Sequence, residues 1–212
     1  MVYSKDHPGD RVEFSFAGSQ AIRMQIEQGA PVDVFASADL VQMQPLVDAR
    51  LVGPPQIFAH NRLVVIASRK SGKVRSLSDL TRPGARIVIG GPTVSVGRYT
   101  TEVLAKVVQA YGKDFKSQVM ANVASYEVSV RAVLTKVVLG EADAGFVYTT
   151  DAAGSGRAAI LIADISARFN VVAAYPIAVI SQTSNKPGAK AFLSLVLGRQ
   201  GQEILARHGL QK

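Results

Sequence analysis

Three stretches of the sequence place small or hydroxyl residues directly before an expected helix. They are Ala17–Ser19 before a helix over 20–28, Val94–Gly97 before one over 98–111, and Ser125–Val130 before one that ends at Leu139. Backbone N–H groups in the first turn of a helix lack partners inside the helix, and the helix dipole favours negative charge there. Every strand-to-helix junction has such groups, but three of this composition in a positively charged chain favour an anionic ligand.

The residue types needed for enzymatic or metal chemistry are missing. The sequence has no cysteine, and its three histidines, His7, His60 and His208, do not have the spacing of metal ligands. It contains no Gly-x-x-x-x-Gly-Lys-Ser/Thr, Gly-x-Gly-x-x-Gly or Gly-x-Ser-x-Gly motif. Asp33 and Asp39 flank an expected strand, where a helix cap is favoured over a reactive carboxylate pair. We therefore predict no enzyme, no catalytic residues, no cofactor and no directly coordinated metal ion.

The net charge of +8, from 24 Lys and Arg against 16 Asp and Glu, indicates either an anionic partner or a basic surface. The densest cationic cluster, Arg69, Lys70, Lys73 and Arg75, surrounds Gly72 and has no aromatic residues among its members. A solvated loop is favoured over a nucleic-acid surface, and we expect no nucleic-acid partner.

Periodicity predicts an α/β fold with mostly parallel sheets. Strands are expected at 11–17, 32–37, 62–68, 86–90, 116–122, 144–148, 160–163 and 171–180. Helices are expected at 20–28, 38–49, 98–111, 128–139, 187–197 and 200–208, with a short helical turn at 78–81. The long apolar strands at 62–68 and 171–180 bracket an α/β block. This predicts two lobes joined by two crossing segments, 1–62 with 171–212 as lobe 1 and 63–170 as lobe 2.

Several segments together resemble the periplasmic molybdate-binding proteins of ABC transporters, the ModA family of type II substrate-binding proteins. Two stretches, Gly29–Asp39 and Gly145–Ala152, are quite specific to that family, and the second lies within the matching segment Gly140–Ala152. The other matching segments are Phe14–Ser19, Asn61–Val65, Val94–Tyr99, Val130–Arg131, Tyr175–Val179 and Ala191–Leu193.

The resemblance implies a type II periplasmic-binding-protein fold whose two lobes close a cleft on molybdate or tungstate. In the family, hydroxyls and backbone N–H groups hold the dianion without a Lys or Arg countercharge. Matched residue by residue, these ligands fall on Ser19, Val96, Val130 and Tyr148, so that molybdenum or tungsten is bound only as its oxyanion. Ser95 stands where the family's Val-Pro-x-Gly-x-Tyr loop has Pro.

The resemblance also sets expectations for the N-terminus and for partners. The chain begins near the end of the family's first helix, so we expect that the family's signal peptide, first strand and one further Ser ligand are absent from this sequence. We expect a truncated form with weaker binding and lower stability than a complete relative. The implied partner is an ABC permease in the membrane, served by a monomeric protein that is periplasmic, or extracellular and membrane-attached.

Two alternatives remain open. One is a binding protein for sulfate, phosphate or a small organic acid, because selectivity among tetrahedral dianions depends on cavity size. The other is the effector-sensing domain of a LysR-type transcription regulator, which shares the fold; no helix-turn-helix segment flanks the matching region of this sequence.

Overall fold

The computed structural model describes residues 2–156 and 159–212, which separate into two compact units. Unit 1 comprises Met1–His60 and Ala174–Lys212, and unit 2 comprises Asn61–Ala173. Two strands, β2 (Gln56–Ser68) and β7 (Val172–Val179), contain the unit boundaries and continue from one unit into the other. None of the described helices is long and apolar enough to cross a membrane.

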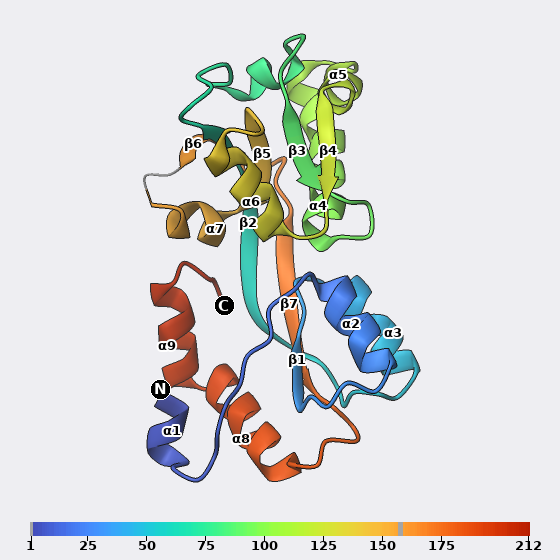
Figure 1. The fold of residues 1–212 in the computed structure, drawn as a ribbon, viewed down its shortest axis with the longest axis vertical. Helices are drawn as coiled ribbons and strands as arrows, with labels where there is room; N and C mark the ends of the chain where they lie inside the picture. The colour runs from blue at the N-terminus through green and yellow to red at the C-terminus, as the bar shows by residue number, and fades with distance from the viewer. Residues whose placement is uncertain (1, 157–158) are drawn as a thin grey trace. The chain divides into compact units, whose positions relative to one another are not determined.

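Unit 1 is mainly helical and also contains the short strand β1 and parts of β2 and β7 (Figure 1). Its elements are α1 (Val2–Asp6), α2 (Ser19–Glu27), β1 (Val34–Ala36), α3 (Leu40–Asp48), α8 (Lys186–Leu197) and α9 (Arg199–Arg207). β1 pairs with β7 in antiparallel register, Phe35 opposite Ala178. The apolar faces of α2 and α3 cover this pair, because their large side chains recur at helical spacing. The buried residues of this core are Ile26, Phe35, Met43, Leu46, Val52, Ala178 and Ile180.

Unit 2 is a sheet with helices packed against it (Figure 1). Its elements are η1 (Leu77–Thr81), β3 (Ile87–Gly90), α4 (Ser95–Tyr111), α5 (Phe115–Ala121), β4 (Val123–Glu127), α6 (Val130–Leu139), β5 (Ala144–Tyr148), α7 (Thr149–Gly154) and β6 (Ala159–Asp164). The strand order is β2-β5-β3-β4, with β6 paired to β2. β2 from Leu63 to Ser68 and all of β5 are buried, as their continuous apolar sequences predict. One core cluster consists of Val64, Ile66, Val88, Val133, Val137, Ala142 and Val147.

The expectation of mostly parallel pairing is wrong. β3 runs parallel to β4 and to β5, but β2 runs antiparallel to both β5 and β6, and β1 runs antiparallel to β7. Every antiparallel pair includes β2 or β7, the two strands that continue between units. Among the pairs whose direction is described, the parallel ones involve β3, β4 and β5, whose connections are helical crossovers as parallel pairs require.

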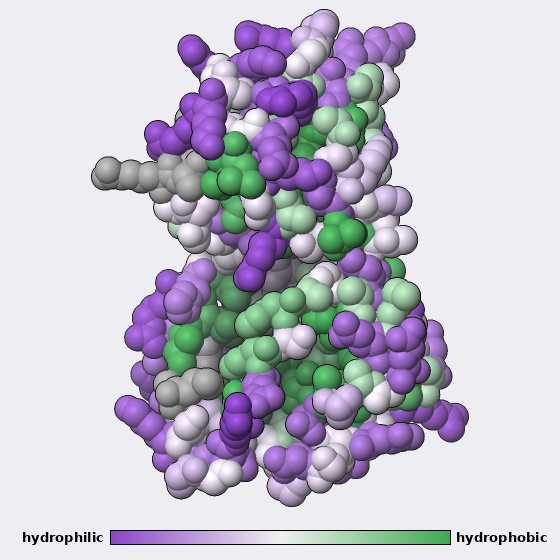
Figure 2. Space-filling view, in the orientation of Figure 1, coloured by the Kyte–Doolittle hydropathy of each residue, from purple (hydrophilic) through white to green (hydrophobic). Residues whose placement is uncertain are grey.

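The strand predicted at 11–17 is also absent. The segment joins α1 to α2 as extended chain, and no described strand pairs with it. Its alternating side chains point outward instead: the Phe14 and Phe16 rings stack on each other at 5.8 Å, and Phe16 is 76% exposed. On the face of unit 1 drawn in Figure 2, hydrophobic surface lies exposed between hydrophilic side chains. Alternation of apolar and polar residues is typical of a strand, but a strand also needs a neighbouring strand to which its backbone can form hydrogen bonds.

A second correction concerns the strand predicted at 116–122. These residues form α5, and the strand follows them as β4. Phe115 and Val119 are both buried and lie four residues apart, which is helical spacing. The three apolar residues Val119–Ala121 are too few to distinguish a strand from a helix, so the strand was predicted too early in the sequence.

Candidate anion-binding site

Three of the four predicted ligand residues lie at one edge of the sheet in unit 2. Val96 follows β3 at the start of α4, Val130 follows β4 as the first residue of α6, and Tyr148 is the last residue of β5. β3 lies between β4 and β5 and is parallel to both (Figure 1). The carboxyl ends of neighbouring parallel strands meet at the same edge, where open α/β sheets bind ligands. Ser19 is the fourth predicted residue and belongs to unit 1.

The start of α4 is pressed against the end of β3 through two glycines. A Cβ atom added to Gly97 would lie 2.2 Å from the carbonyl oxygen of Gly91 and 2.3 Å from that of Gly90. A Cβ added to Gly90 would lie 2.6 Å from a methyl group of Val96. The loop is tied to the neighbouring strand as well, since the Gly91 N–H donates to the Glu127 carbonyl at 2.8 Å. Glycine at 90 and 97 therefore sets the position of the first turn of α4.

The first turn of α4 offers backbone donors at a buried position. The first N–H groups that bond within this turn are those of Gly97 and Arg98, both to the Val94 carbonyl at 2.9 and 3.1 Å. The N–H groups of Ser95 and Val96 precede them, and a helix has no carbonyl to offer at these positions. Both residues are buried. The turn can therefore donate hydrogen bonds to an anion, with the helix dipole adding to the attraction.

The start of α6 has the same character. Its N-cap is Ser129, whose Oγ accepts a hydrogen bond from the Ala132 N–H at 3.2 Å. The first N–H to bond a carbonyl in this turn is that of Val133, which donates to Ser129. The N–H of Val130 precedes it, and the Val130 side chain packs on the apolar cluster under α6. The cap and the core contact together orient this donor.

Tyr148 is held by its backbone and its ring. It is 4% exposed, lies opposite Leu63 of β2, and its N–H donates to the Asp151 carboxylate at 3.2 Å. Its ring meets that of Tyr99 edge to face, with 6.4 Å between centroids. Burial raises the pKa of Asp151 above its ordinary value, and the hydrogen bond from Tyr148 and the charge of Arg131 only partly oppose this effect.

The residues that follow Tyr148 are anchored to β2 by Asn61. The Asn61 side chain accepts a hydrogen bond from the Thr149 hydroxyl at 2.6 Å and donates one to the Thr150 hydroxyl at 2.9 Å. Asn61 is itself buried. The turn from β5 into α7 is therefore fixed directly after Tyr148.

Ser19 begins α2 in unit 1, directly after the N-cap Gly18. Its Oγ accepts a hydrogen bond from the Ala38 N–H at 3.0 Å, which joins the start of α2 to the loop after β1. Asp39 in that loop is the N-cap of α3, as favoured from the sequence, and accepts from the Gln42 N–H at 2.7 Å. The Ser19 hydroxyl keeps its own proton available for donation, because a hydroxyl both donates and accepts.

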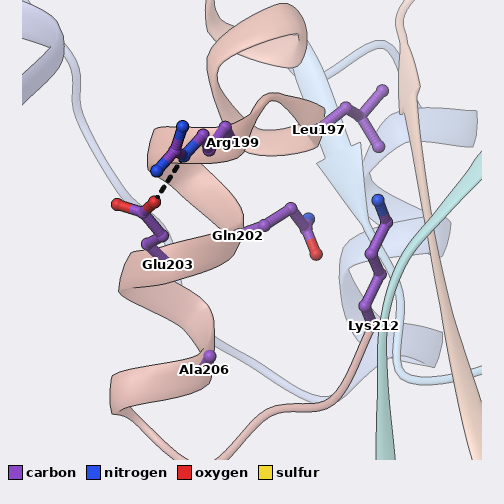
Figure 3. Close-up of a pocket in the computed structure, with 6 residues that line it drawn as sticks. All are labelled: Leu197, Arg199, Gln202, Glu203, Ala206 and Lys212. Carbon is purple, nitrogen blue, oxygen red and sulfur yellow. Dashed lines mark hydrogen bonds and ion pairs between the residues drawn. The ribbon is translucent and has the colours of Figure 1, made fainter.

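Other features do not compete with this arrangement. Among the described residues, no group of three or more His, Cys, Asp or Glu could hold a metal ion. A pocket in unit 1 is lined by Leu197, Arg199, Gln202, Glu203, Ala206 and Lys212, and none of the predicted ligand residues lines it (Figure 3). Two of the charged residues that line this pocket, Arg199 and Glu203, form an ion pair with each other at 2.8 Å. The predicted ligand residues do not include Ser95, whose buried hydroxyl becomes evident only in the folded chain.

Comparison with known proteins defines the class. Residues 1–211 match the profile of the family described as bacterial extracellular solute-binding protein. The chain therefore belongs to a family of solute-binding proteins, which are not enzymes.

More specific relatives narrow this class. The molybdate-binding protein ModA of Mycobacterium bovis is 38% identical over 212 residues, which are 99% of this chain and 77% of that protein. The solved periplasmic molybdate-binding protein of Azotobacter vinelandii is 25% identical with a TM-score of 0.81, covering 100% of this chain and 91% of that one. The chain belongs to the ModA family of bacterial substrate-binding proteins.

The same fold occurs in a binding protein for a different anion. The sulfate-binding protein SubI of Mycobacterium tuberculosis has a TM-score of 0.82 at 19% identity, covering 95% of this chain and 76% of that one. This likeness concerns the fold alone, and confirms the α/β periplasmic-binding-protein class predicted from the sequence.

Proposed function

We propose that this protein captures molybdate or tungstate outside the cytoplasm and delivers it to an ABC permease. The observation that carries the proposal is the placement of Val96, Val130 and Tyr148 at the carboxyl ends of three neighbouring parallel strands. Family membership and 38% identity to the molybdate-binding protein ModA of Mycobacterium bovis support the choice of ligand.

The proposed chemistry is binding without turnover. The N–H groups of Val96 and Val130 and the Tyr148 hydroxyl donate hydrogen bonds to the oxygens of the dianion. Bonds to a charged acceptor are shorter and about twice as strong as those between neutral groups. The dipoles of α4 and α6 add favourable potential, so that no Lys or Arg countercharge is required.

We extend the proposal to Ser19 of unit 1 as a fourth ligand residue, on the strength of its match to the family. Its hydroxyl is oriented by the Ala38 N–H, which occupies one lone pair and leaves the proton for the ion. The protein acts as a monomer in this proposal, and its partner in the membrane is the permease.

Thermal unfolding with molybdate, tungstate, sulfate and phosphate tests the proposal. A ligand at several hundred times its dissociation constant stabilises the folded state by about 3–4 kcal/mol. For a chain of this length, this raises Tm by roughly 6–16 °C. We expect the increase with molybdate and tungstate, and a cooperative melt without any increase would contradict the proposal.

Variants then test the assigned ligand residues. Tyr148→Phe and Ser19→Ala each remove one donor, and we expect each to weaken molybdate binding on the order of tenfold or more in calorimetric titration. Ser117→Ala is the matched control, because Ser117 lies exposed on α5 and bonds only the Asp114 carbonyl among the hydrogen bonds described. Unchanged affinity in Tyr148→Phe would remove that residue from the site.

A further inference from the structure

Ser95, the first residue of α4, has a buried hydroxyl without a partner. The residue is 3% exposed, and its Oγ has no hydrogen-bond partner among the described residues. Two other buried hydroxyls are bonded: Ser37 donates to the Asp39 carbonyl at 2.8 Å, and Thr100 donates to the Val96 carbonyl at 2.7 Å. An unsatisfied buried polar group destabilises the folded state, so native proteins seldom leave one without a reason.

Local bonding does not account for this hydroxyl. Ser and Thr side chains within helices commonly donate to the carbonyl four residues earlier. Thr100 and Thr101 on the same helix do so, to Val96 and Gly97. The corresponding carbonyl for Ser95 belongs to Gly91, and the backbone of Gly97 is packed against that oxygen.

The hydroxyl lies on the part of α4 that the proposed site uses. Cα–Cβ bonds in a helix tilt toward its N-terminus, so the Ser95 side chain projects from the same end as the Val96 N–H. Tyr99 follows four residues later on the same helix face, and its ring packs edge to face on that of Tyr148. Ser95 therefore shares a face with the residue that contacts the proposed Tyr148 ligand.

We propose that the Ser95 hydroxyl donates a hydrogen bond to the bound tetrahedral oxyanion. This inference rests on the proposed function and adds one ligand residue to it. The start of α4 then supplies two adjacent donors, an O–H from Ser95 and an N–H from Val96. The bound oxyanion then gives the buried Ser95 hydroxyl a hydrogen-bond partner. The destabilising effect of the unbonded hydroxyl is therefore removed only in the complex.

The test compares Ser95→Ala with the wild-type protein and with Ser117→Ala, using two readouts. Calorimetric titration with sodium molybdate measures affinity, and thermal unfolding without ligand measures stability. We expect Ser95→Ala to weaken molybdate binding about 10- to 100-fold, the range for a hydrogen bond to a charged group. We expect its ligand-free Tm to be equal to or higher than that of the wild type, because the substitution removes an unsatisfied group.

Each outcome decides between the two proposals. If the wild type binds molybdate and Ser95→Ala binds it equally well, the role of Ser95 is wrong and the proposed function stands. If the ligand-free Tm falls together with affinity, Ser95 is structural and the inference is overturned. If the wild type binds sulfate in place of molybdate, the choice of ligand fails and the Ser95 comparison is made with sulfate. Failure to bind any of the four oxyanions overturns both.

Discussion

Gly97→Ala should separate α4 from β3 and thereby damage both stability and binding. The added Cβ would lie 2.2 Å from the Gly91 oxygen and 2.3 Å from the Gly90 oxygen, where ordinary contact begins at 3.4 Å. The first turn of α4 must therefore move by about 1.2 Å, the difference between 3.4 and 2.2 Å. Both obstructing atoms belong to the backbone, which cannot rotate away as a side chain would.

The expected cost follows from this clash. Overpacking of a close-packed interior ordinarily costs about 1–3 kcal/mol, and a clash with two carbonyl oxygens belongs at the upper end. For a chain of this length, about 3 kcal/mol lowers Tm by roughly 6–12 °C. The same displacement moves the Ser95 and Val96 donors, so molybdate affinity should fall as well.

Circular dichroism melts and urea unfolding at pH 7 measure the loss of stability, and calorimetric titration measures affinity. Gly91→Ala is the matched control from the same loop, because a Cβ there would lie 3.6 Å from its nearest neighbours. We expect that control to change stability by about 0.5 kcal/mol or less. A Tm for Gly97→Ala within about 1 °C of the wild type would refute the close-approach argument.

Two further predictions concern the framework of unit 2. Burial alone would raise the pKa of Asp143, but hydrogen bonds from Arg86 and Ser71 and the Arg86 charge together hold it below its ordinary value. Its stabilising effect is therefore present above the unfolded pKa of about 3.9 and is lost as pH falls through the lower folded pKa. Tm measured from pH 6 to 3 should fall less in Asp143→Asn than in the wild type or in Asp114→Asn, and parallel curves would contradict this. Asn170→Ala should cost roughly 2–4 kcal/mol, because the side chain bonds both the N–H and the carbonyl of Leu63. Urea unfolding should show a smaller loss for Asn185→Ala, which removes only an exposed cap of α8.

Much of the fold could be predicted from continuous apolar runs. The runs at 62–68 and 144–148 are buried on both faces of a sheet, and that environment is what excludes polar residues. The segment 11–17 was mispredicted because its alternation is a property of the segment itself. Pairing depends on whether another strand lies alongside, and this information is not contained in those seven residues.

The candidate site could be predicted only in part for a related reason. Val96 and Val130 are proposed as donors through their backbone N–H groups, and any residue type provides such a group. Their apolar side chains instead indicate that these positions are buried, as the packing of Val130 on the core under α6 illustrates. These two assignments therefore came from resemblance to a family and not from side-chain chemistry.

What the sequence does record at such a site is the set of residues that bring the backbone into place. Gly97 is required because two carbonyl oxygens occupy the space of its side chain, and Ser129 because its hydroxyl caps the turn that presents Val130. Ser95 records something different, since its hydroxyl is neither a cap nor a bond within the helix. A buried hydroxyl that the folded chain leaves unsatisfied is best explained by a partner that arrives later, and the proposed oxyanion is such a partner. Substituting a residue that positions backbone donors should therefore lower both the stability of the protein and its affinity for molybdate. Ser95→Ala should lower the affinity alone.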